Sequence, residues 1–185
     1  IIPLFVPHAG CPHQCVFCDQ RSISGAAEPV TPRQVAAAVE QALRRSGPGA
    51  ELAVYGGSFT AIDPAAQEAL LAAAQPFLAD GRLGALRCST RPDAVDPAVI
   101  DRLRRYGVGT VELGCQSMDE AVLRAAGRGH TAADSRRAAA LLHAAGIQVV
   151  TQMMTGLPGD SDEGALATAR ALADLRPEGV RIYPT

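Results

Sequence analysis

The sequence predicts an α/β fold, a partial (β/α)6 barrel of the TIM type built on a parallel sheet. Two observations point to it: short apolar runs alternate with stretches of helical periodicity, and six of these runs have the length of buried strands. The chain has 185 residues, of which 48% are hydrophobic, and this is enough to bury one core. We therefore expect a single domain over residues 1–185.

The predicted strands follow one another at intervals that leave room for a helix between each pair. They are residues 4–6, 52–55, 83–88, 110–113, 148–154 and 180–183. The predicted helices are residues 33–45, 65–79, 98–106, 120–126 with 132–145, and 163–175. Repetition of this kind calls for parallel strands with the helices on the outside of the sheet.

Several predicted helices have a recognisable first turn. Thr31, Asp63 and Asp96 each offer a capping oxygen directly before a proline, a residue favoured at the first helical position. Ser117 and Glu120 have the spacing of a capping box, so we expect a helix to begin there as well.

The number of strands decides between two architectures. Six are too few to close an eight-stranded barrel, which takes roughly 250 residues. We expect a splayed, partial barrel, and a flat doubly wound sheet is the alternative. In both architectures the carboxyl ends of the strands carry the chemistry, so residues that directly follow a strand are the site candidates.

Composition excludes several classes of protein. The net charge of −2 gives no sign of a polyanionic partner. All 17 basic residues are Arg, and a chain without Lys has neither Schiff-base catalysis nor a Walker A phosphate loop. There is no apolar run long enough for a membrane span and no basic-then-apolar leader, so we expect a cytoplasmic protein without a membrane partner. Because the chain starts at Ile1 rather than Met, we also expect it to be a piece of a longer protein.

Three cysteines lie close together after the first predicted strand. Cys11, Cys15 and Cys18 have the spacing C-x₃-C-x₂-C, and three such sulfurs cannot all pair as disulfides. Nothing in the chain indicates an oxidising compartment. Three interpretations are open: a 4Fe–4S cluster with one iron left for another ligand, a structural zinc completed by His8 or His13, or three unrelated buried thiols.

With the aromatic Phe17 directly before the third cysteine, the loop resembles the cluster motif of the radical S-adenosylmethionine (SAM) enzymes. The resemblance implies that Cys11, Cys15 and Cys18 hold a 4Fe–4S cluster and that SAM binds the open iron. In that family an electron from the reduced cluster cleaves SAM to methionine and a 5′-deoxyadenosyl radical, which abstracts hydrogen from the substrate. An external one-electron reductant is therefore an expected partner.

Segments after the later strands extend this resemblance. Residues 55–60 resemble the Gly-Gly-Glu-type motif that accepts the amino group of SAM. Four further segments resemble, in order and spacing, those of the family branch with an Elongator catalytic-subunit-like (Elp3-type) core. They are residues 88–93, 111–119, 128–131 and 154–159. The resemblance covers residues 5–183 and implies a radical SAM core domain.

The resemblance also implies roles for single residues. The implied contacts are Phe17 to the adenine, Gly56, Gly57 and Ser58 to the methionyl group, Gln116 and Gln152 to the ribose, and Arg128 to the carboxylate of SAM. Gln152 stands in place of an aspartate. Ser89 stands where the relatives have an acid, whose reach a serine lacks.

Other polar and sulfur-containing residues have simpler interpretations. Cys88 and Cys115 lie in strand-end runs, and we expect them to pack in the core rather than bind a second cluster. Glu112 is an acid inside an apolar strand, so it needs a partner, and Arg91 is the expected one. His143 on a helix is expected to be structural or exposed.

The substrate does not follow from these residues. In the Elongator-like relatives it is transfer RNA, modified at the wobble uridine, although the sequence shows neither the aromatic platform nor the strong positive charge that RNA binding favours. Tetrapyrrole chemistry is a second possibility, because of the resemblance to oxygen-independent coproporphyrinogen oxidases. A non-catalytic zinc or iron–sulfur module is the alternative from another class of protein.

Overall fold

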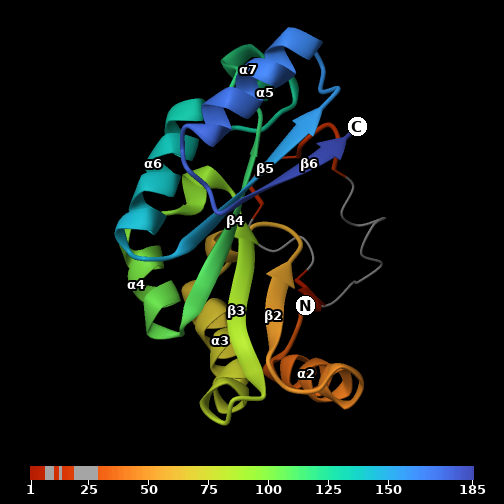
Figure 1. The fold of residues 1–185 in the computed structure, drawn as a ribbon, viewed down its shortest axis with the longest axis vertical. Coiled ribbons are helices and arrows are strands. Elements are labelled where there is room, and N and C mark those ends of the chain that lie inside the picture. The colour runs from red at the N-terminus through yellow and green to blue at the C-terminus, as the bar shows by residue number, and fades with distance from the viewer. Residues whose placement is uncertain (7–10, 13, 19–28) are drawn as a thin grey trace.

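The computed structural model describes residues 1–6, 11–12, 14–18 and 29–185 (Figure 1). Six strands form one parallel sheet whose spatial order is the order of the chain, β1 to β6. The sheet is an open half-barrel, so the predicted partial barrel is confirmed and the flat doubly wound sheet is wrong. A sheet that adds each new strand on the same side curls in one direction and gathers its carboxyl ends around one opening.

The observed strands and helices agree closely with the predicted ones. The strands are β1 (Ile2–Phe5), β2 (Ala50–Tyr55), β3 (Leu83–Thr90), β4 (Val108–Gln116), β5 (Gln148–Thr155) and β6 (Gly179–Pro184). The helices are α2 (Pro32–Ser46), α3 (Pro64–Ala79), α4 (Pro97–Arg105), α5 (Glu120–Ala125), α6 (Ala132–Ala144) and α7 (Asp162–Ala173), with the short 3₁₀ turns η1 (Phe59–Ala61) and η2 (Pro92–Ala94).

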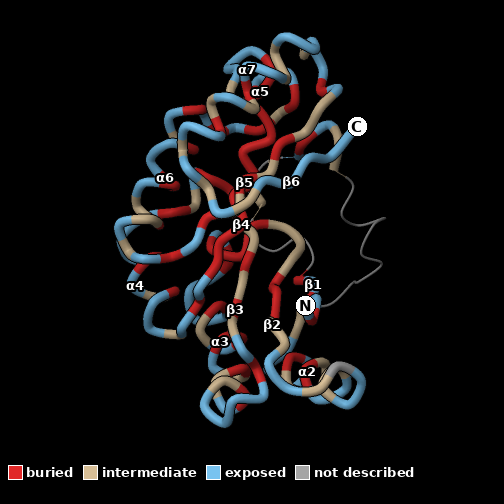
Figure 2. Tube along the Cα trace, in the orientation of Figure 1, coloured by how far each residue is buried: buried red, intermediate tan, exposed pale blue. Residues whose placement is uncertain are grey.

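The main core lies between the sheet and its helices. Figure 2 shows buried positions along the central strands and on the sides of the helices that face them. Val39 of α2, Phe77 of α3 and Leu142 of α6 are among the buried side chains that pack in this core. Cys88 and Cys115 are fully buried in the same core, so their predicted packing role is confirmed.

The other face of the sheet is polar. Side chains alternate between the two faces of a strand, so residues paired in register point to the same face. Ser89 pairs with Glu112, and Gln152 pairs with Arg181. The concave face of the half-barrel therefore carries polar and charged groups, while the convex face carries the core.

Helix starts follow the predicted signals with one exception. Thr31, Asp63 and Asp96 each accept a hydrogen bond from a backbone N–H of the first turn. The capping box predicted at Ser117 is wrong, because Asp119 caps α5 instead. β4 runs on to Gln116, so Ser117 lies in the turn before the helix, and α5 itself begins at Glu120 as predicted.

Within the described ranges, every helix is too short or too polar to cross a lipid bilayer.

Candidate functional site

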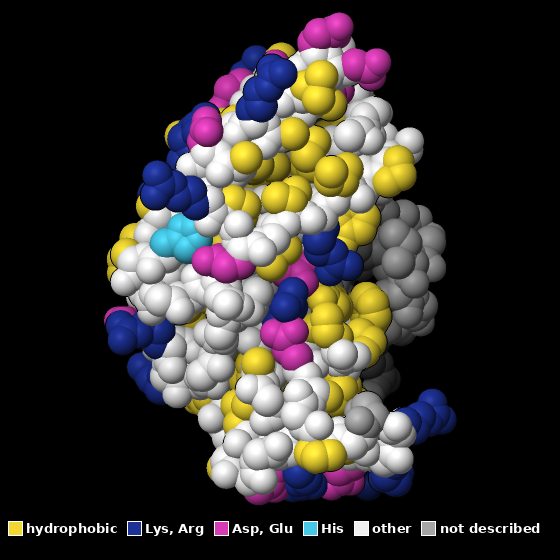
Figure 3. Space-filling model, in the orientation of Figure 1, with side chains coloured by type: hydrophobic (Ala, Val, Ile, Leu, Met, Phe, Trp, Pro, Cys, Tyr) yellow, Lys and Arg dark blue, Asp and Glu magenta, His cyan; other side chains and the backbone are white. Residues whose placement is uncertain are grey.

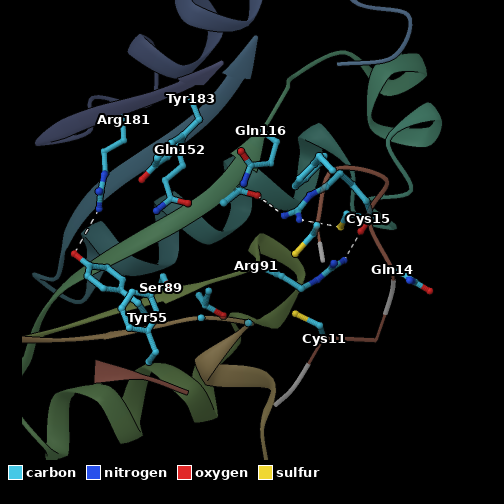
Figure 4. A pocket seen from close by; sticks show the side chains of 18 of the residues that line it. Cys11, Gln14, Cys15, Tyr55, Ser89, Arg91, Gln116, Gln152, Arg181 and Tyr183 are labelled. Atoms are coloured by element: carbon cyan, nitrogen blue, oxygen red, sulfur yellow. Dashed lines mark hydrogen bonds between the residues drawn. The ribbon is translucent and has the colours of Figure 1, made fainter. Parts of the chain in front are cut away.

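A cavity of about 830 Å³ lies at the carboxyl ends of the strands, on the concave face (Figure 4). Its walls include residues from all six strands or from the segments that follow them. The predicted site residues that line it are Cys11, Cys15, Phe17, Cys18, Gly56, Gly57, Ser89, Gln116, Arg128 and Gln152. Residues far apart in the sequence are thus brought to one space of the size that small-molecule ligands occupy.

The cysteine segment is held against the turn that follows α5. Val16 donates its backbone N–H to the carbonyl of Ala126, and Cys18 donates to the carbonyl of Cys15. Gly127 has a φ of +66°, and a Cβ there would lie 3.2 Å from the backbone oxygen of Gln14. The close approach of the two segments therefore requires a glycine at this position.

Cys11, Cys15 and Cys18 line one end of the cavity, which we call its thiol end. Cys15 is buried, whereas Cys11 and Cys18 are half-buried. Burial raises the pKa of the Cys11 thiol above its usual value, and the charge of Arg91 opposes this effect. In the described part of the chain, no three His, Cys, Asp or Glu side chains surround the position of one metal ion. Cysteines on a cubane bind separate irons, so a cluster does not require such a grouping.

Arg128 connects the thiol end to β4. Its Nη1 donates to Cys15 Sγ at 3.3 Å, and its Nη2 donates to the carbonyl of Gly114 at 2.6 Å. The guanidinium carbon lies 5.9 Å from the centre of the Phe17 ring. Arg128 is buried, and its Nε has no partner in the described residues. This arginine can therefore offer a bound ligand one further donor without losing its present contacts.

Gln116 ends β4 in an unusual backbone conformation. Its φ of 67° lies in the left-handed region, which is uncommon for residues other than glycine. The side chain is buried, and among the described residues its Oε1 has no hydrogen-bond partner. A strained residue that aims an unpaired polar group into a cavity is a common feature of functional sites.

The Gly-Gly turn after β2 brings backbone close to the cavity. Gly56 has a φ of +86°, and a Cβ there would lie 3.1 Å from the carbonyl oxygen of Val6. Ser58, expected to line the cavity with the two glycines, is fully buried beside it and does not line it. Its hydroxyl instead bonds Thr90 Oγ1 at 2.8 Å and accepts from the backbone N–H of Arg91 at 3.2 Å. Ser58 thus fixes the end of β3.

Glu112 lies beneath the cavity at the centre of a charged network. Its Oε1 accepts from the Tyr55 hydroxyl at 2.9 Å and from Arg87 at 3.1 Å. Its Oε2 accepts from Gln152 at 2.7 Å and from Arg181 at 2.8 Å. Figure 3 shows acidic and basic side chains adjoining one another in the middle of this face.

The network sets the charge state of its members. Burial opposes ionisation of Glu112, but the donors from Arg87, Gln152, Tyr55 and Arg181 outweigh it and hold the pKa of the carboxyl below its ordinary value. Burial, together with the hydrogen bond to the Glu112 carboxylate, raises the pKa of the Tyr55 phenol. Glu112 is therefore an ionised, fully hydrogen-bonded carboxylate.

The prediction that Arg91 is the partner of Glu112 is wrong. Arg91 pairs with Asp93 instead, through Nε at 2.9 Å and Nη2 at 3.1 Å. Arg91 stands at the end of β3 and turns toward the thiol end, whereas Glu112 lies deeper, in the middle of β4. Partners of a buried acid depend on the register between strands, which the sequence of one strand does not reveal.

The side of the cavity away from the cysteines carries aromatic rings. Phe5 and Tyr55 have ring centres 6.2 Å apart, and Arg181 lies 5.8 Å from the Tyr55 ring and 5.5 Å from the Tyr183 ring. These three aromatic residues form what we call the aromatic end of the cavity. Few aromatic residues occur in the chain, and no local pattern indicates that the fold brings three of them together as a platform.

The charge of the cavity wall is one-sided. Among the described lining residues, Arg91, Arg128 and Arg181 are the charged groups, and neither Asp nor Glu is present. Since Arg91 and Arg181 are already paired with Asp93 and Glu112, the wall mainly offers hydrogen-bond donors, which suit a ligand with accepting groups.

Among the described residues, no histidine lines the cavity. His130 is buried, and burial, with the neighbouring charge of Arg128, lowers its pKa to about 4. His143 is half-buried on α6, 3.5 Å from Glu178, in agreement with a structural role. His8 and His13, the candidate zinc ligands, lie outside the described residues.

Comparison with known proteins identifies the family. The sequence model of the Radical SAM superfamily matches residues 5–172, most of the chain. The chain belongs to this superfamily. As a radical SAM protein it is an enzyme of a family whose members use a 4Fe–4S cluster and SAM.

The radical SAM core is similar to that of Elongator catalytic-subunit-like proteins over its whole length. A tRNA uridine(34) acetyltransferase of Methanocaldococcus infernus is 29% identical, in an alignment that covers 100% of this chain and 42% of the relative. A protein of the same name from Dehalococcoides mccartyi is 37% identical over 58% of this chain and 24% of the relative. The chain therefore spans less than half the length of these curated relatives.

Solved structures agree with this assignment. The structure of Elp3 from Methanocaldococcus infernus gives a TM-score of 0.73 at 26% identity, and the match covers 100% of this chain and 46% of that one. Methylornithine synthase gives a TM-score of 0.75 at 17% identity, over 98% of this chain and 52% of that one, and shares the fold.

The residues of this cavity fit the cofactors of the family. Three thiols share one end of the cavity with buried donors and acceptors that lack a partner in the described residues, namely Arg91 Nη1, Arg128 Nε and Gln116 Oε1. Thiolates are the usual ligands of iron–sulfur clusters, and unpaired buried polar atoms are costly unless a ligand satisfies them.

Sequence reasoning missed several residues of the site. Gly114 admits the close approach of Gln116 and Arg128, since a Cβ there would lie 3.2 Å from Gln116 Nε2 and 3.4 Å from Arg128 Nη2. Arg181 and Tyr183 are two apart on β6, and this spacing is the signal that both face the concave side.

Proposed function

We propose that this chain is the radical-generating core of an enzyme that cleaves SAM reductively at a 4Fe–4S cluster and abstracts a hydrogen atom from its substrate. Cys11, Cys15 and Cys18 would hold the cluster. The observation that carries the proposal is that these thiols share one cavity with unpartnered polar atoms of Gln116 and Arg128.

When bound, the reduced cluster would supply one electron to the sulfonium, which yields methionine and a 5′-deoxyadenosyl radical that takes a hydrogen atom from the substrate. An external one-electron reductant must supply that electron. The protein's part is to hold the cofactor in one orientation and to keep water out of the cavity.

The proposed cofactor contacts divide along the cavity wall. Arg128 would neutralise the carboxylate of SAM, and Gly56 and Gly57 would lie against its methionyl group. Gln116 and Gln152 would meet the ribose hydroxyls, to which an amide can both donate and accept. Phe17 lies on the thiol side of the cavity, where its ring can face the adenine.

Ser58 and Ser89 are the less direct contacts. Ser58 does not line the cavity, so its part would be to hold Thr90 and Arg91 in position. Ser89 lines the cavity with a short hydroxyl in place of an acid, so the cofactor would gain at most a neutral hydrogen bond there.

For the substrate we propose a transfer RNA. Two similar proteins bear the name tRNA uridine(34) acetyltransferase. The aromatic end of the cavity supports this choice, because flipped-out or single-stranded bases stack on aromatic side chains and on arginine. Tyr183 and Arg181 are partly exposed there and accessible to a base.

The test is anaerobic reconstitution with iron and sulfide, followed by dithionite and SAM. We expect formation of 5′-deoxyadenosine, which Cys15→Ala abolishes. Cys88→Ala is the matched control, because that thiol is fully buried away from the cavity. A colourless protein with one bound zinc per chain would contradict the proposal and favour a structural metal module.

The substrate is tested with the same preparation. Unmodified transfer RNA should raise the rate of 5′-deoxyadenosine formation, and RNA that is deuterated at carbon should transfer label to the 5′ carbon. No response to any transfer RNA, with SAM cleavage intact, would leave the radical chemistry standing and reject the RNA substrate.

A further inference from the structure

Arg91 has a guanidinium that is fixed along one edge. Asp93 accepts from Nε and Nη2, and Nη2 also donates to the backbone carbonyl of Arg128. A bidentate pair of this kind sets the plane of the guanidinium as well as its position. The direction of the remaining nitrogen, Nη1, is therefore fixed.

That remaining nitrogen has no use within the described part of the protein. Arg91 is only 3% exposed, and its Nη1 is buried without a hydrogen-bond partner. A buried N–H of a charged group that is left unsatisfied is costly, more so than a neutral one. Such an atom in a native fold calls for an acceptor that the described residues do not provide.

The location of Arg91 indicates where that acceptor lies. Arg91 lines the cavity, and Figure 4 shows its side chain between Cys11 and Cys15. The described cavity wall contains no carboxylate that could accept a hydrogen bond from Nη1 in place of a ligand.

Arg128 alone leaves an anion incompletely bound. Its two terminal nitrogens each bond one acceptor, Cys15 Sγ and the carbonyl of Gly114, and among the described residues Nε has no partner. Each of these two neighbouring arginines therefore has one nitrogen without a partner in the described part of the chain, and Arg91 also donates to the backbone carbonyl of Arg128.

We propose that Arg91 is a cofactor-anchoring residue, whose Nη1 donates to an anionic acceptor at the thiol end of the cavity. This inference rests on the proposed function. Two acceptors have this chemistry: the α-carboxylate of SAM and a sulfide of the cluster. Asp93 then acts as a positioning residue, because it holds the guanidinium of Arg91 in place. Of the two paired side chains, Asp93 is the one nearer the protein surface.

The test compares Arg91→Gln with Arg102→Gln in the reconstituted protein. Arg102 is a matched control, because it too is partly buried, donates to Gln67 and forms a salt bridge with Glu68, but it lies on α4 and does not line the cavity. Equilibrium dialysis measures SAM affinity, and a titration followed by electron paramagnetic resonance (EPR) measures the midpoint potential of the cluster without SAM.

The two acceptors give different results. If the carboxylate is the partner, Arg91→Gln weakens SAM binding roughly 10- to 100-fold, and the loss disappears with decarboxylated SAM, which lacks that group. If a sulfide is the partner, the SAM-free midpoint potential shifts to more negative values, because a nearby positive charge and a hydrogen bond favour the reduced cluster. Arg102→Gln changes neither quantity.

A second variant is needed because Arg91→Gln could fail to fold. Asp93→Asn keeps the Arg91 charge but loosens its orientation, and we expect a smaller change of the same kind. Unchanged SAM affinity and unchanged potential in both variants would overturn the inference while the wild-type protein still cleaves SAM. Failure of the wild-type protein to hold a cluster would instead reject the proposed function, and this inference with it.

Discussion

Arg128 Nη1 lies 3.3 Å from Cys15 Sγ, although 113 positions separate the two residues in the sequence. The contact joins the loop after the first strand to the turn after α5. It places a permanent positive charge beside a candidate cluster ligand. The geometry of this pair depends on two glycines, Gly114 and Gly127, and both can be tested.

Gly114→Ala should weaken cofactor binding without unfolding the protein. A Cβ at this position would lie 3.2 Å from Gln116 Nε2 and 3.4 Å from Arg128 Nη2, so one of these side chains must move. Loss of one hydrogen bond to a charged ligand predicts a roughly tenfold rise in the Kd for SAM. Gly109→Ala on the same strand is the control, because a Cβ there meets nothing within 4 Å. Equal affinities in the two variants would reject the role given to Gly114.

Gly127→Ala should impair loading of the cluster. Its φ of +66° is strained for alanine, and its Cβ would also press on the backbone oxygen of Gln14 at 3.2 Å. Gly146→Ala has the same kind of strain, with a φ of +73°, but nothing within 4 Å. Both variants should lose about 1 to 2 kcal/mol of stability. Iron bound per chain after reconstitution should fall in Gly127→Ala alone.

Glu112→Gln should lower the free energy of unfolding and should make it less sensitive to acidic pH. The variant leaves donors of Arg87 and Arg181 without a carboxylate, at a cost of about 1 to 3 kcal/mol in the free energy of unfolding. Because the pKa of Glu112 is lowered in the folded state, its stabilisation is present above the unfolded-state pKa, about 4.3, and is lost as pH falls through the folded-state value.

Urea unfolding at a series of pH values measures both effects. The difference in stability between wild type and Glu112→Gln should be constant near neutral pH and shrink on acidification below about pH 4.3. Glu163→Gln, an exposed change in the first turn of α7, serves as the control. A difference that does not depend on pH would contradict the ionised state given to Glu112.

Tyr183→Leu should separate substrate binding from SAM cleavage. Base stacking on an aromatic ring contributes about 1 to 3 kcal/mol, so the Kd for transfer RNA should rise roughly tenfold or more. Cleavage of SAM in the absence of RNA should not change, since the ring lies at the aromatic end of the cavity. The control is Ile182→Ala, whose exposed side chain is next along β6 and faces the other side of the sheet. If both variants bind RNA as wild type does, the aromatic end is not the RNA-binding surface.

Local signals in the sequence were sufficient for the order of the elements. Capping residues before Pro32, Pro64 and Pro97 mark three helix starts, and these caps act within a few residues of the chain. The cysteine spacing and the Gly-Gly turn likewise lie in single short segments. Their placement at strand ends was enough to predict that they would share one cavity.

Contacts between distant strands were beyond such reasoning. The partners of Glu112 come from β2, β3, β5 and β6, and they follow from the register of the whole sheet. The cap of α5 was missed because β4 continues to Gln116, and the left-handed turn there is set by packing rather than by local propensity. Arg91 was given the wrong partner for the same reason.

The most direct test of the central claim is the EPR spectrum of the reduced, reconstituted protein, recorded with and without SAM. A cluster held by Cys11, Cys15 and Cys18 with one open iron should show a reduced 4Fe–4S signal whose g-values change when SAM binds. Cys15→Ala should lose that response, and Cys88→Ala should keep it. A reduced signal that is identical with and without saturating SAM, or no iron–sulfur signal at all, would contradict the account.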